Sequence, residues 1–276
     1  MNCLDFYDNE YTDQVPKQMK IQSALSKGRT PYSSIEFISP YSPIKYNSVN
    51  VAIGRRSSGK THAVCEELIR ISSAPRIHML IYVTKNKNIV CPTFAKFRPL
   101  IKCPIVEVEV EDIDNFLKNI ISYKEWYEKV IEENKANLIK TEHPDLFEEF
   151  KEVLGIDDFK VRGLQTLVFL DDSANASYLK PKSYITSLLS ENRQPRITFF
   201  INIQYWKSLG TFIKPNINTL FIFGAFSSQQ VRYITQQIPM QVTFEEFMSD
   251  YRQLDNHDHI VLDCDSGKYK MIFCDA

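Results

Sequence analysis

The chain has 276 residues and a formal net charge of −1; 43% of its residues are hydrophobic and 24% are charged. This length allows one large α/β domain or two small ones, and the composition is that expected of a soluble globular protein. There is no apolar run of about 18 residues, and the acidic N-terminus lacks an apolar core, so the sequence predicts neither a membrane span nor a signal peptide.

Charge is distributed unevenly along the chain. Residues 1–103 carry 15 Lys/Arg and 7 Asp/Glu, residues 104–160 carry 7 and 16, and residues 161–276 carry 11 and 11. The basic first third could face a nucleic acid, and the acidic middle could not. Ordinary solvated faces explain the same pattern, and charge alone favours that simpler interpretation.

Cysteines and histidines form no metal-site pattern in the sequence. The six cysteines are scattered without a CxxC pair, so we expect neither a disulfide framework nor a zinc site, and a reducing compartment fits better. The five histidines show neither the H-x-x-x-H nor the H-E-x-x-H spacing.

The first third of the chain contains the first predicted strands. Residues 1–46 are polar and carry four prolines, which predicts an irregular N-terminal segment followed by one domain over residues 47–276. Ser48–Ile53 reads as a buried strand, Lys60–Ser73 has apolar residues at helical spacing, and Ile77–Val83 reads as a second strand.

The middle of the chain changes from strand to helix periodicity. Ile105–Val110 alternates like a strand with one solvated face. Asp112–Ile139 has the apolar spacing of one long amphipathic helix with an acidic outer face, and Asp112 is a plausible N-cap. Asp145–Leu154 predicts a shorter helix that ends at Gly155.

The C-terminal part alternates strands with helices and closes with a hairpin. We expect helices near residues 182–190, 205–212, 227–237 and 244–251. The predicted strands are Leu164–Leu170, Ile197–Ile203, Thr219–Phe223, and a final pair, His259–Cys264 and Tyr269–Phe273, joined by an Asp-Ser-Gly turn. This order predicts an α/β fold with a mostly parallel sheet flanked by helices and a C-terminal β-hairpin.

A phosphate-loop motif follows the first predicted strand. The stretch GRRSSGKT matches G-x-x-x-x-G-K-[ST], and two of only eight glycines in the chain fall within it. A strand precedes the motif and a helix follows it, as nucleotide binding requires. The predicted nucleotide-binding residues are Gly54, Arg55, Arg56, Ser57, Ser58, Gly59, Lys60 and Thr61.

Each residue type in the motif has a chemical reason. Glycines let backbone N–H groups curl around phosphate oxygens, Lys60 can neutralise the β- and γ-phosphates, and the Thr61 hydroxyl can ligate Mg²⁺. We therefore expect ATP and Mg²⁺ as cofactors. Arg55 and Arg56 are unusual inside such a loop, and they either add positive charge near the nucleotide or point to solvent.

Two acids end the strand LVFLDD. An acid pair can simply cap a strand, but a phosphate-loop protein needs a carboxylate near Mg²⁺ at the C-terminal end of a neighbouring strand. We assign Asp171 to Mg²⁺ through water, and Asp172 to orienting or deprotonating the attacking water. The second acid favours a water-activating ATPase over small-molecule kinases and GTPases, which generally lack it.

The strand ITFFINIQ supplies the next candidate. In an additional-strand phosphate-loop ATPase, a strand lies between those carrying the phosphate loop and the acid pair, and a polar residue at its tip faces the γ-phosphate. Gln204 is well placed for that role, and Asn202 is the nearby competitor.

If the protein works as a ring, a neighbouring subunit would supply an arginine. Arg193 is the first candidate for that cation, followed by Arg232 and Arg196.

GRRSSGKT, TLVFLDDSA and LLSENRQPRITFFINIQYWKSLGTFIKPNINTLFIFGAF, in this order, resemble the genome-packaging ATPases of large DNA viruses and virophages. These proteins belong to the FtsK–HerA lineage of P-loop NTPases, of the additional-strand ATPase type. The resemblance covers about residues 48–237. Its most specific parts are the NRQPRITFFINIQ and KPNINTLFIF segments. Family members often carry Arg where Lys214 stands, and this departure argues against an arginine finger at that position.

The resemblance implies an ATP-driven motor that translocates double-stranded DNA into a viral capsid as a ring-forming homo-oligomer. It implies capsid proteins as further partners, no membrane, and a location in the viral factory of the host cytoplasm and in the virion. Two other functions stay open at this point. A nucleotide or nucleoside kinase would transfer a phosphoryl group to a small acceptor, and a non-motor regulator would bind nucleotide with little turnover.

Overall fold

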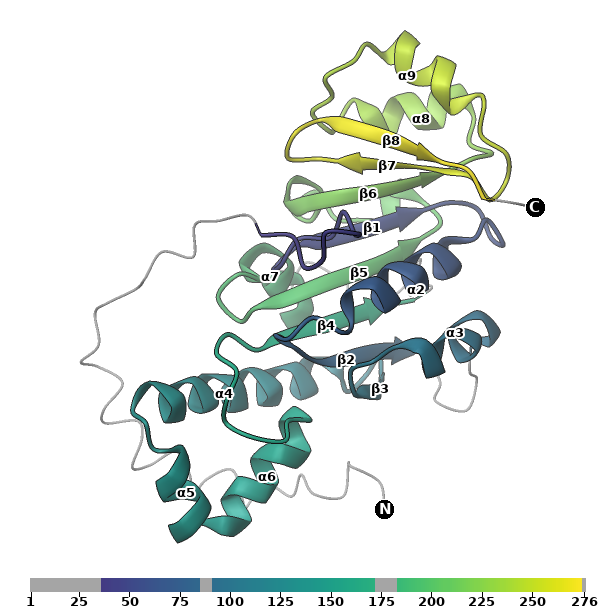
Figure 1. Ribbon diagram of the computed structural model, residues 1–276. Coiled ribbons are helices and arrows are strands. Elements are labelled where there is room, and N and C mark those ends of the chain that lie inside the picture. Colours follow the sequence, from purple (N-terminus) through teal and green to yellow (C-terminus); the bar gives the residue numbers. More distant parts are fainter. Residues whose placement is uncertain (1–35, 85–90, 172–182, 275–276) are drawn as a thin grey trace. The chain divides into compact units, whose positions relative to one another are not determined.

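In the computed structural model, the described residues are 36–84, 91–171 and 183–274. They form one eight-stranded sheet in the order β3-β2-β4-β5-β1-β6-β7-β8 (Figure 1). Neighbours from β3 to β6 are parallel, and β7 and β8 are antiparallel. The strands are β1 (Val49–Ile53), β2 (Ile77–Thr84), β3 (Ile105–Glu109), β4 (Gln165–Leu170), β5 (Ile197–Ile203), β6 (Ile217–Phe223), β7 (His259–Asp263) and β8 (Lys268–Ile272). The predicted α/β fold with a C-terminal hairpin is confirmed.

The position of β5 is the topological feature that matters most for function. β5 lies between β1, which leads into the phosphate-loop motif, and β4, which leads into the acid pair. This is the arrangement expected of the additional-strand type. All three strands run parallel, so their carboxyl ends meet at one edge of the sheet.

Helices cover both faces of the sheet. α2 and α3 pack on one face, and α4, α7, α8 and α9 pack on the other (Figure 1). The helices are α2 (Lys60–Ile71), α3 (Pro92–Phe97), α4 (Ile113–Glu132), α5 (Ala136–Glu142), α6 (Pro144–Leu154), α7 (Tyr184–Glu191), α8 (Ser228–Thr235) and α9 (Phe244–Tyr251), with short 3-10 turns η1 (Arg98–Leu100), η4 (Trp206–Ser208) and η5 (Lys214–Asn216). In these described ranges, no helix is long and apolar enough to span a bilayer.

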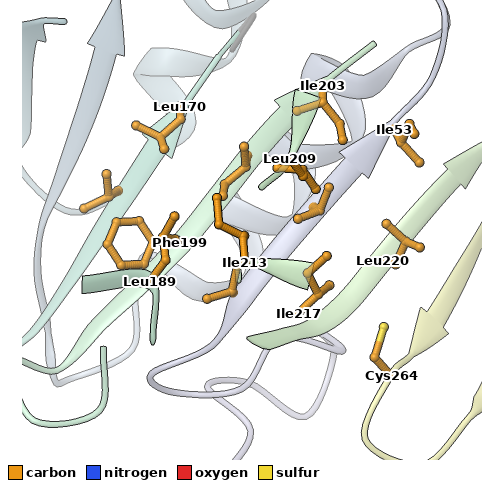
Figure 2. Packing of buried hydrophobic residues seen from close by; sticks show 14 of the residues in the cluster. Ile53, Leu170, Leu189, Phe199, Ile203, Leu209, Ile213, Ile217, Leu220 and Cys264 are labelled. Atoms are coloured by element: carbon orange, nitrogen blue, oxygen red, sulfur yellow. The ribbon is translucent and has the colours of Figure 1, made fainter. Parts of the chain in front are cut away.

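Covering both faces explains why the central strands are apolar without interruption. Successive residues of β5 alternate between the two faces, so Phe199 packs with the α4 side and Phe200 with the α2 side. The segment after β5 covers part of the face on which α4 packs: its Leu209 and Ile213 side chains lie in the same cluster as Phe199 and Ile203 (Figure 2).

Two predicted helices are shorter than the periodicity suggested. The expected helix over residues 112–139 is split into α4 and α5, because Asn134 adopts a left-handed conformation with φ 53°. The break lets Val130 and Ile139 enter one apolar cluster from different directions. Asp112 occupies the N-cap position of α4, but its side chain accepts no capping hydrogen bond.

The expected helix near residues 205–212 is only the 3-10 turn η4. The side chains of Leu209 and Ile213 are buried against the sheet. One short turn is enough to bring both of them there, so no longer helix is needed.

The N-terminal segment lies partly outside the described residues. Residues 36–46 contain one isolated antiparallel bridge, Phe37 to Lys45, and the buried Ile38 and Ile44 pack with the α2 face. Lys45 donates to Asp263 and Asp265, both at 2.9 Å. These contacts tie residues 36–46 to the C-terminal hairpin turn. The domain boundary expected at residue 47 stays a prediction.

A buried polar network joins the α4–α6 region to the sheet. His78 Nδ1 donates to the Leu154 carbonyl at 2.7 Å, and His78 Nε2 accepts from the Thr166 hydroxyl at 2.8 Å. The Lys124 ammonium donates to Thr166 Oγ1 at 3.0 Å and to the carbonyls of residues 195 and 196. Burial, reinforced by the Lys124 charge, lowers the pKa of His78 to about 3. His78 is therefore neutral in the folded protein at neutral pH.

This pKa makes folding sensitive to acid. The unfolded chain binds a proton at His78 below its ordinary pKa of about 6.5 and the folded chain does not, so stability is complete above that pH and falls as the pH drops toward 3. We expect His78 to account for a loss of about 2 kcal/mol between pH 7 and pH 5. Urea unfolding at several pH values measures it. In His78→Gln, the free energy of unfolding should depend less steeply on pH over this range, by the equivalent of about one proton taken up on unfolding. An unchanged slope would contradict the assignment.

Candidate functional site

The backbone of residues Gly54–Thr61 is shaped by its glycines. A Cβ at Gly54 would stand 2.3 Å from Ser58 Oγ and 2.8 Å from Phe223 Cβ, so this position admits no side chain. Gly59 has φ 93°, which favours glycine, and α2 begins at the next residue. The loop therefore closes tightly at the N-terminus of a helix, where the helix dipole favours an anion.

Two polar side chains of the loop have environments that suit a bound anion. Lys60 Nζ donates to the carbonyls of Gly54 at 2.9 Å and Arg55 at 2.8 Å, so the ammonium lies across the loop. Ser58 Oγ is fully buried, and no described residue offers it a hydrogen-bond partner. A buried unpaired hydroxyl is costly, and a bound anion would satisfy it.

Three strand ends converge beside the loop. Thr61 Oγ1 donates to Asp171 Oδ1 at 3.1 Å, and Asn202 Nδ2 donates to the same carboxylate oxygen at 2.7 Å and to Thr61 Oγ1 at 3.3 Å. Because Leu170 pairs with Ile201, Asp171 stands at the level of Asn202. Thus α2, β4 and β5 each contribute one polar side chain to a triangle.

Neutral groups surround the far side of Asp171. The Tyr82 hydroxyl lies 3.4 Å from Asp171 Oδ2, and its ring stacks on Phe94 with centroids 3.8 Å apart. Burial raises the pKa of Tyr82, and the Asp171 carboxylate raises it further. Burial is also the main cause that raises the pKa of Cys65 and Cys91, with Asp171 contributing to both. These three groups therefore stay protonated at neutral pH.

This donor set suits a magnesium ion. A threonine hydroxyl and a carboxylate supply the oxygen ligands that Mg²⁺ prefers, and Asn202 Oδ1 is a further buried oxygen without a described donor. Within the described part of the chain there is no cluster of three or more His, Cys, Asp or Glu that would suit a transition metal. The residues present therefore fit Mg²⁺ together with a phosphate group held by the loop.

The structure says less about the other predicted site residues, Gln204, Asp172, Arg55 and Arg56. Gln204 directly follows β5, so it lies at the same edge of the sheet as Asn202. Asp172 lies outside the described residues. Arg55 and Arg56 are exposed. For Gln204 and Asp172, the roles expected from the sequence stay predictions.

The three candidate arginines have different environments. Arg193 is exposed and precedes β5, so it lies at the edge of the sheet opposite to Asp171. Arg196 is half-buried and pairs with Glu128 at 2.8 Å. Arg232 on α8 stacks over the Phe244 ring, 4.0 Å from its centroid, and lies 3.7 Å from Glu245. Arg193 therefore stands at the far end of β5 from the Thr61, Asp171 and Asn202 side chains of its own chain.

Sequence reasoning missed two residues of this region. Tyr82 is an ordinary apolar-strand residue in the sequence, and only the neighbouring position of β2 and β4 brings it to Asp171. His257 precedes β7, and its Nδ1 stands 3.4 Å from the place where a Gly59 Cβ would be. No local pattern signals either contact, because both join segments that are far apart in the chain.

No protein-family model matches the chain, and no curated protein matches it. Among solved structures it is similar to the DNA-packaging ATPase B204 of Sulfolobus turreted icosahedral virus, with 16% identity over 82% of this chain and 96% of that chain and a TM-score of 0.48. B204 of Sulfolobus turreted icosahedral virus 2 in complex with AMPPCP gives 15% identity, 81% and 96% coverage, and a TM-score of 0.47.

The cytoplasmic domain of the type VII secretion ATPase EccC of Thermomonospora curvata gives 11% identity, 78% and 24% coverage, and a TM-score of 0.46. A DNA-packaging ATPase and a type VII secretion ATPase are therefore among the proteins to which the chain is similar in structure. At this level of similarity, the residues of the chain itself carry the inference of function.

The close approach at Gly54 generates a testable expectation. Gly54→Ala should lower the free energy of unfolding by about 1–3 kcal/mol, because the added methyl group overpacks the contact with Ser58 and Phe223. Ser58→Ala removes only an unpaired hydroxyl and should change stability by less than about 1 kcal/mol. Urea unfolding measures both, and a Gly54→Ala protein as stable as wild type would show that the loop does not pack this tightly.

Proposed function

We propose that the chain is an ATP-hydrolysing motor that translocates double-stranded DNA and packages a viral genome into a capsid. The observation that carries the proposal is the triangle of Thr61, Asp171 and Asn202 beside the phosphate loop, built across the inserted strand β5. Resemblance of the loop, acid-pair and β5 segments to genome-packaging ATPases supports the same function.

Each residue has a definite task in this proposal. Lys60 leaves the loop carbonyls and neutralises the β- and γ-phosphates, while Thr61 and Asp171 hold Mg²⁺. Asp172 follows Asp171 in the sequence and orients or deprotonates the attacking water. Gln204 contacts the γ-phosphate from the tip of β5. Mg²⁺, when bound, neutralises charge on the phosphate oxygens.

Hydrolysis follows from the second carboxylate. A small-molecule kinase must protect its γ-phosphate from water, so a water-activating acid beside the site would work against it. Double-stranded DNA is the proposed substrate that the motor translocates. A ring of identical subunits is the proposed active oligomer, with capsid proteins as partners. The proposed location is the viral factory of the host cytoplasm, and the virion.

ATP turnover with and without duplex DNA tests this function. Lys60→Ala should lose nucleotide binding, and Asp172→Asn should bind Mg-ATP but hydrolyse it slowly, because it keeps the shape of the side chain and loses the base. Duplex DNA should stimulate the wild type with little dependence on base sequence. Stimulation by a small acceptor instead of DNA would favour a kinase, and tight nucleotide binding without turnover would favour a regulator.

The ring generates a prediction for Arg193. A cation supplied by the neighbouring subunit stabilises charge on the γ-phosphate and is worth about 10³–10⁵ in rate in other phosphate-loop enzymes. Arg193→Ala should therefore keep nucleotide affinity nearly unchanged while DNA-stimulated turnover collapses. Mixing it with Asp172→Asn should restore some activity, because some mixed interfaces then combine an intact site with an intact arginine.

Arg232→Ala is the matched control and should behave like wild type, since its guanidinium already stacks on Phe244 within its own chain. If Arg232→Ala is inactive while Arg193→Ala is active, the assignment moves to Arg232. If both variants are active and the protein stays monomeric with an ATP analogue and DNA, the ring itself is wrong.

A further inference from the structure

One long stretch of the chain contains no acidic residue. Residues 192–244 include no Asp or Glu, although the whole chain has 34, and they include five Lys or Arg. This stretch forms β5, η4, η5, β6 and α8. Its cations can meet carboxylates only outside the stretch: Arg196 pairs with Glu128, and Arg232 lies near Glu245. The other cations of the stretch are Arg193, Lys207 and Lys214, and their neighbours in sequence within residues 192–244 include no acid.

Two of those cations gather on one aromatic ring. Lys207 Nζ and Lys214 Nζ each lie 5.8 Å from the centroid of the Tyr233 ring. Lys214 also lies 5.4 Å from the Trp206 ring, and its Nζ donates to Gln237 Oε1 at 3.2 Å. We call Lys207, Lys214, Tyr233 and Gln237 the lysine–tyrosine surface.

Among the described residues, the lysine–tyrosine surface has no acidic counter-ion. Neither ammonium is within ion-pair distance of a carboxylate of the described residues, whereas Lys45, Lys140 and Lys151 each pair with at least one acid. Two ammonium groups facing one ring repel each other, and the ring quadrupole compensates only in part. An anion close to both ammonium groups would offset this repulsion, so the arrangement favours a negatively charged partner.

The lysine–tyrosine surface is also fixed in place. The segment between the two lysines is anchored to the sheet by the buried Leu209 and Ile213 (Figure 2), and Asn216 Nδ2 donates to the Phe212 carbonyl at 2.8 Å. Tyr233 is 41% exposed on α8. A partner therefore meets lysines whose backbone is held in place before binding, which reduces the entropy lost on association.

We propose that the lysine–tyrosine surface binds backbone phosphates of duplex DNA. The inference rests on the proposed DNA-translocating function and says where on the chain that DNA is held. Lysine ammonium groups bind phosphate as point charges, and the Tyr233 hydroxyl and the Gln237 amide can donate to phosphate oxygens without reading bases. A motor that moves along any sequence needs contacts of this kind.

The position of the lysine–tyrosine surface links it to the nucleotide site. η4 follows β5 directly after Gln204, and Lys207 comes five positions after Asn202, which touches Asp171 and Thr61. Tyr205, between Gln204 and η4, is 64% exposed. DNA held at Lys207 is therefore connected, through the few residues that follow β5, to Asn202 and its contacts with Asp171 and Thr61.

Salt-dependent DNA binding tests the proposal with the double variant Lys207→Ala/Lys214→Ala. Fluorescence anisotropy with a labelled duplex gives the affinity at several salt concentrations. The loss of two phosphate contacts should weaken binding and make the slope of log K against log salt shallower by roughly 1.8. The effect should be equal for duplexes of unrelated sequence. Lys207→Arg/Lys214→Arg keeps the charges and should retain binding.

The matched control removes the same charge from another surface. Lys268 and Lys270 are exposed on β8, and Lys268→Ala/Lys270→Ala should keep the wild-type slope. If both double variants change the slope equally, net charge rather than this surface governs binding, and the proposal is overturned. Loss of DNA-free turnover in Lys207→Ala/Lys214→Ala as large as the loss of DNA-stimulated turnover would also overturn it, because the lysines would then act at a nucleotide site. A wild type that binds no DNA would instead contradict the proposed function.

Discussion

The hydrogen bond from Asn202 to Asp171 is the contact on which the architecture of the site depends. It exists only because β5 lies between β1 and β4, with all three strands parallel and in a register that brings their carboxyl ends level. Without β5, the strand with the acid would pair directly with the strand that leads into the loop. The inserted strand places the Asn202 side chain between the Thr61 hydroxyl and the Asp171 carboxylate. It also carries Gln204 to the same edge of the sheet.

The opposite edge of the sheet is held together by a different kind of contact. There, His78, Thr166 and Lys124 form a buried chain of hydrogen bonds, and Arg196 pairs with Glu128. A neutral histidine and fully engaged donors make such a network tolerable in an apolar interior. The network fastens α4 to the start of β4 and β5, so the acidic α4–α6 region is joined to the sheet far from Thr61, Asp171 and Asn202.

The uneven charge of the sequence acquires a spatial meaning in the fold. Acidic residues are concentrated in residues 104–160, which form β3 and the α4–α6 region, whereas residues 192–244 have none. In the second stretch, Arg196 and Arg232 have acidic partners, whereas Lys207 and Lys214 have none among the described residues. Net charge near zero therefore says little about any one surface, because electrostatic attraction acts locally and is screened within about 10 Å.

The sequence by itself determined the phosphate loop, the order of strands and helices, the closing hairpin and the position of Asp171 at a strand end. These features depend on local spacing: glycines in an octet, apolar runs of strand length, and an Asp-Ser-Gly turn. Gly155 ends α6 in the left-handed conformation for the same local reason.

Only the tertiary structure decided which distant side chains meet. It brought Asn202 and Tyr82 to Asp171, placed His257 beside Gly59, and gathered Lys207 and Lys214 on the ring of Tyr233. It also broke the expected long helix at Asn134, because packing of Val130 and Ile139 in one cluster outweighed the helical periodicity. Such contacts join residues tens of positions apart, and their geometry is set by strand order and register, which no local pattern encodes.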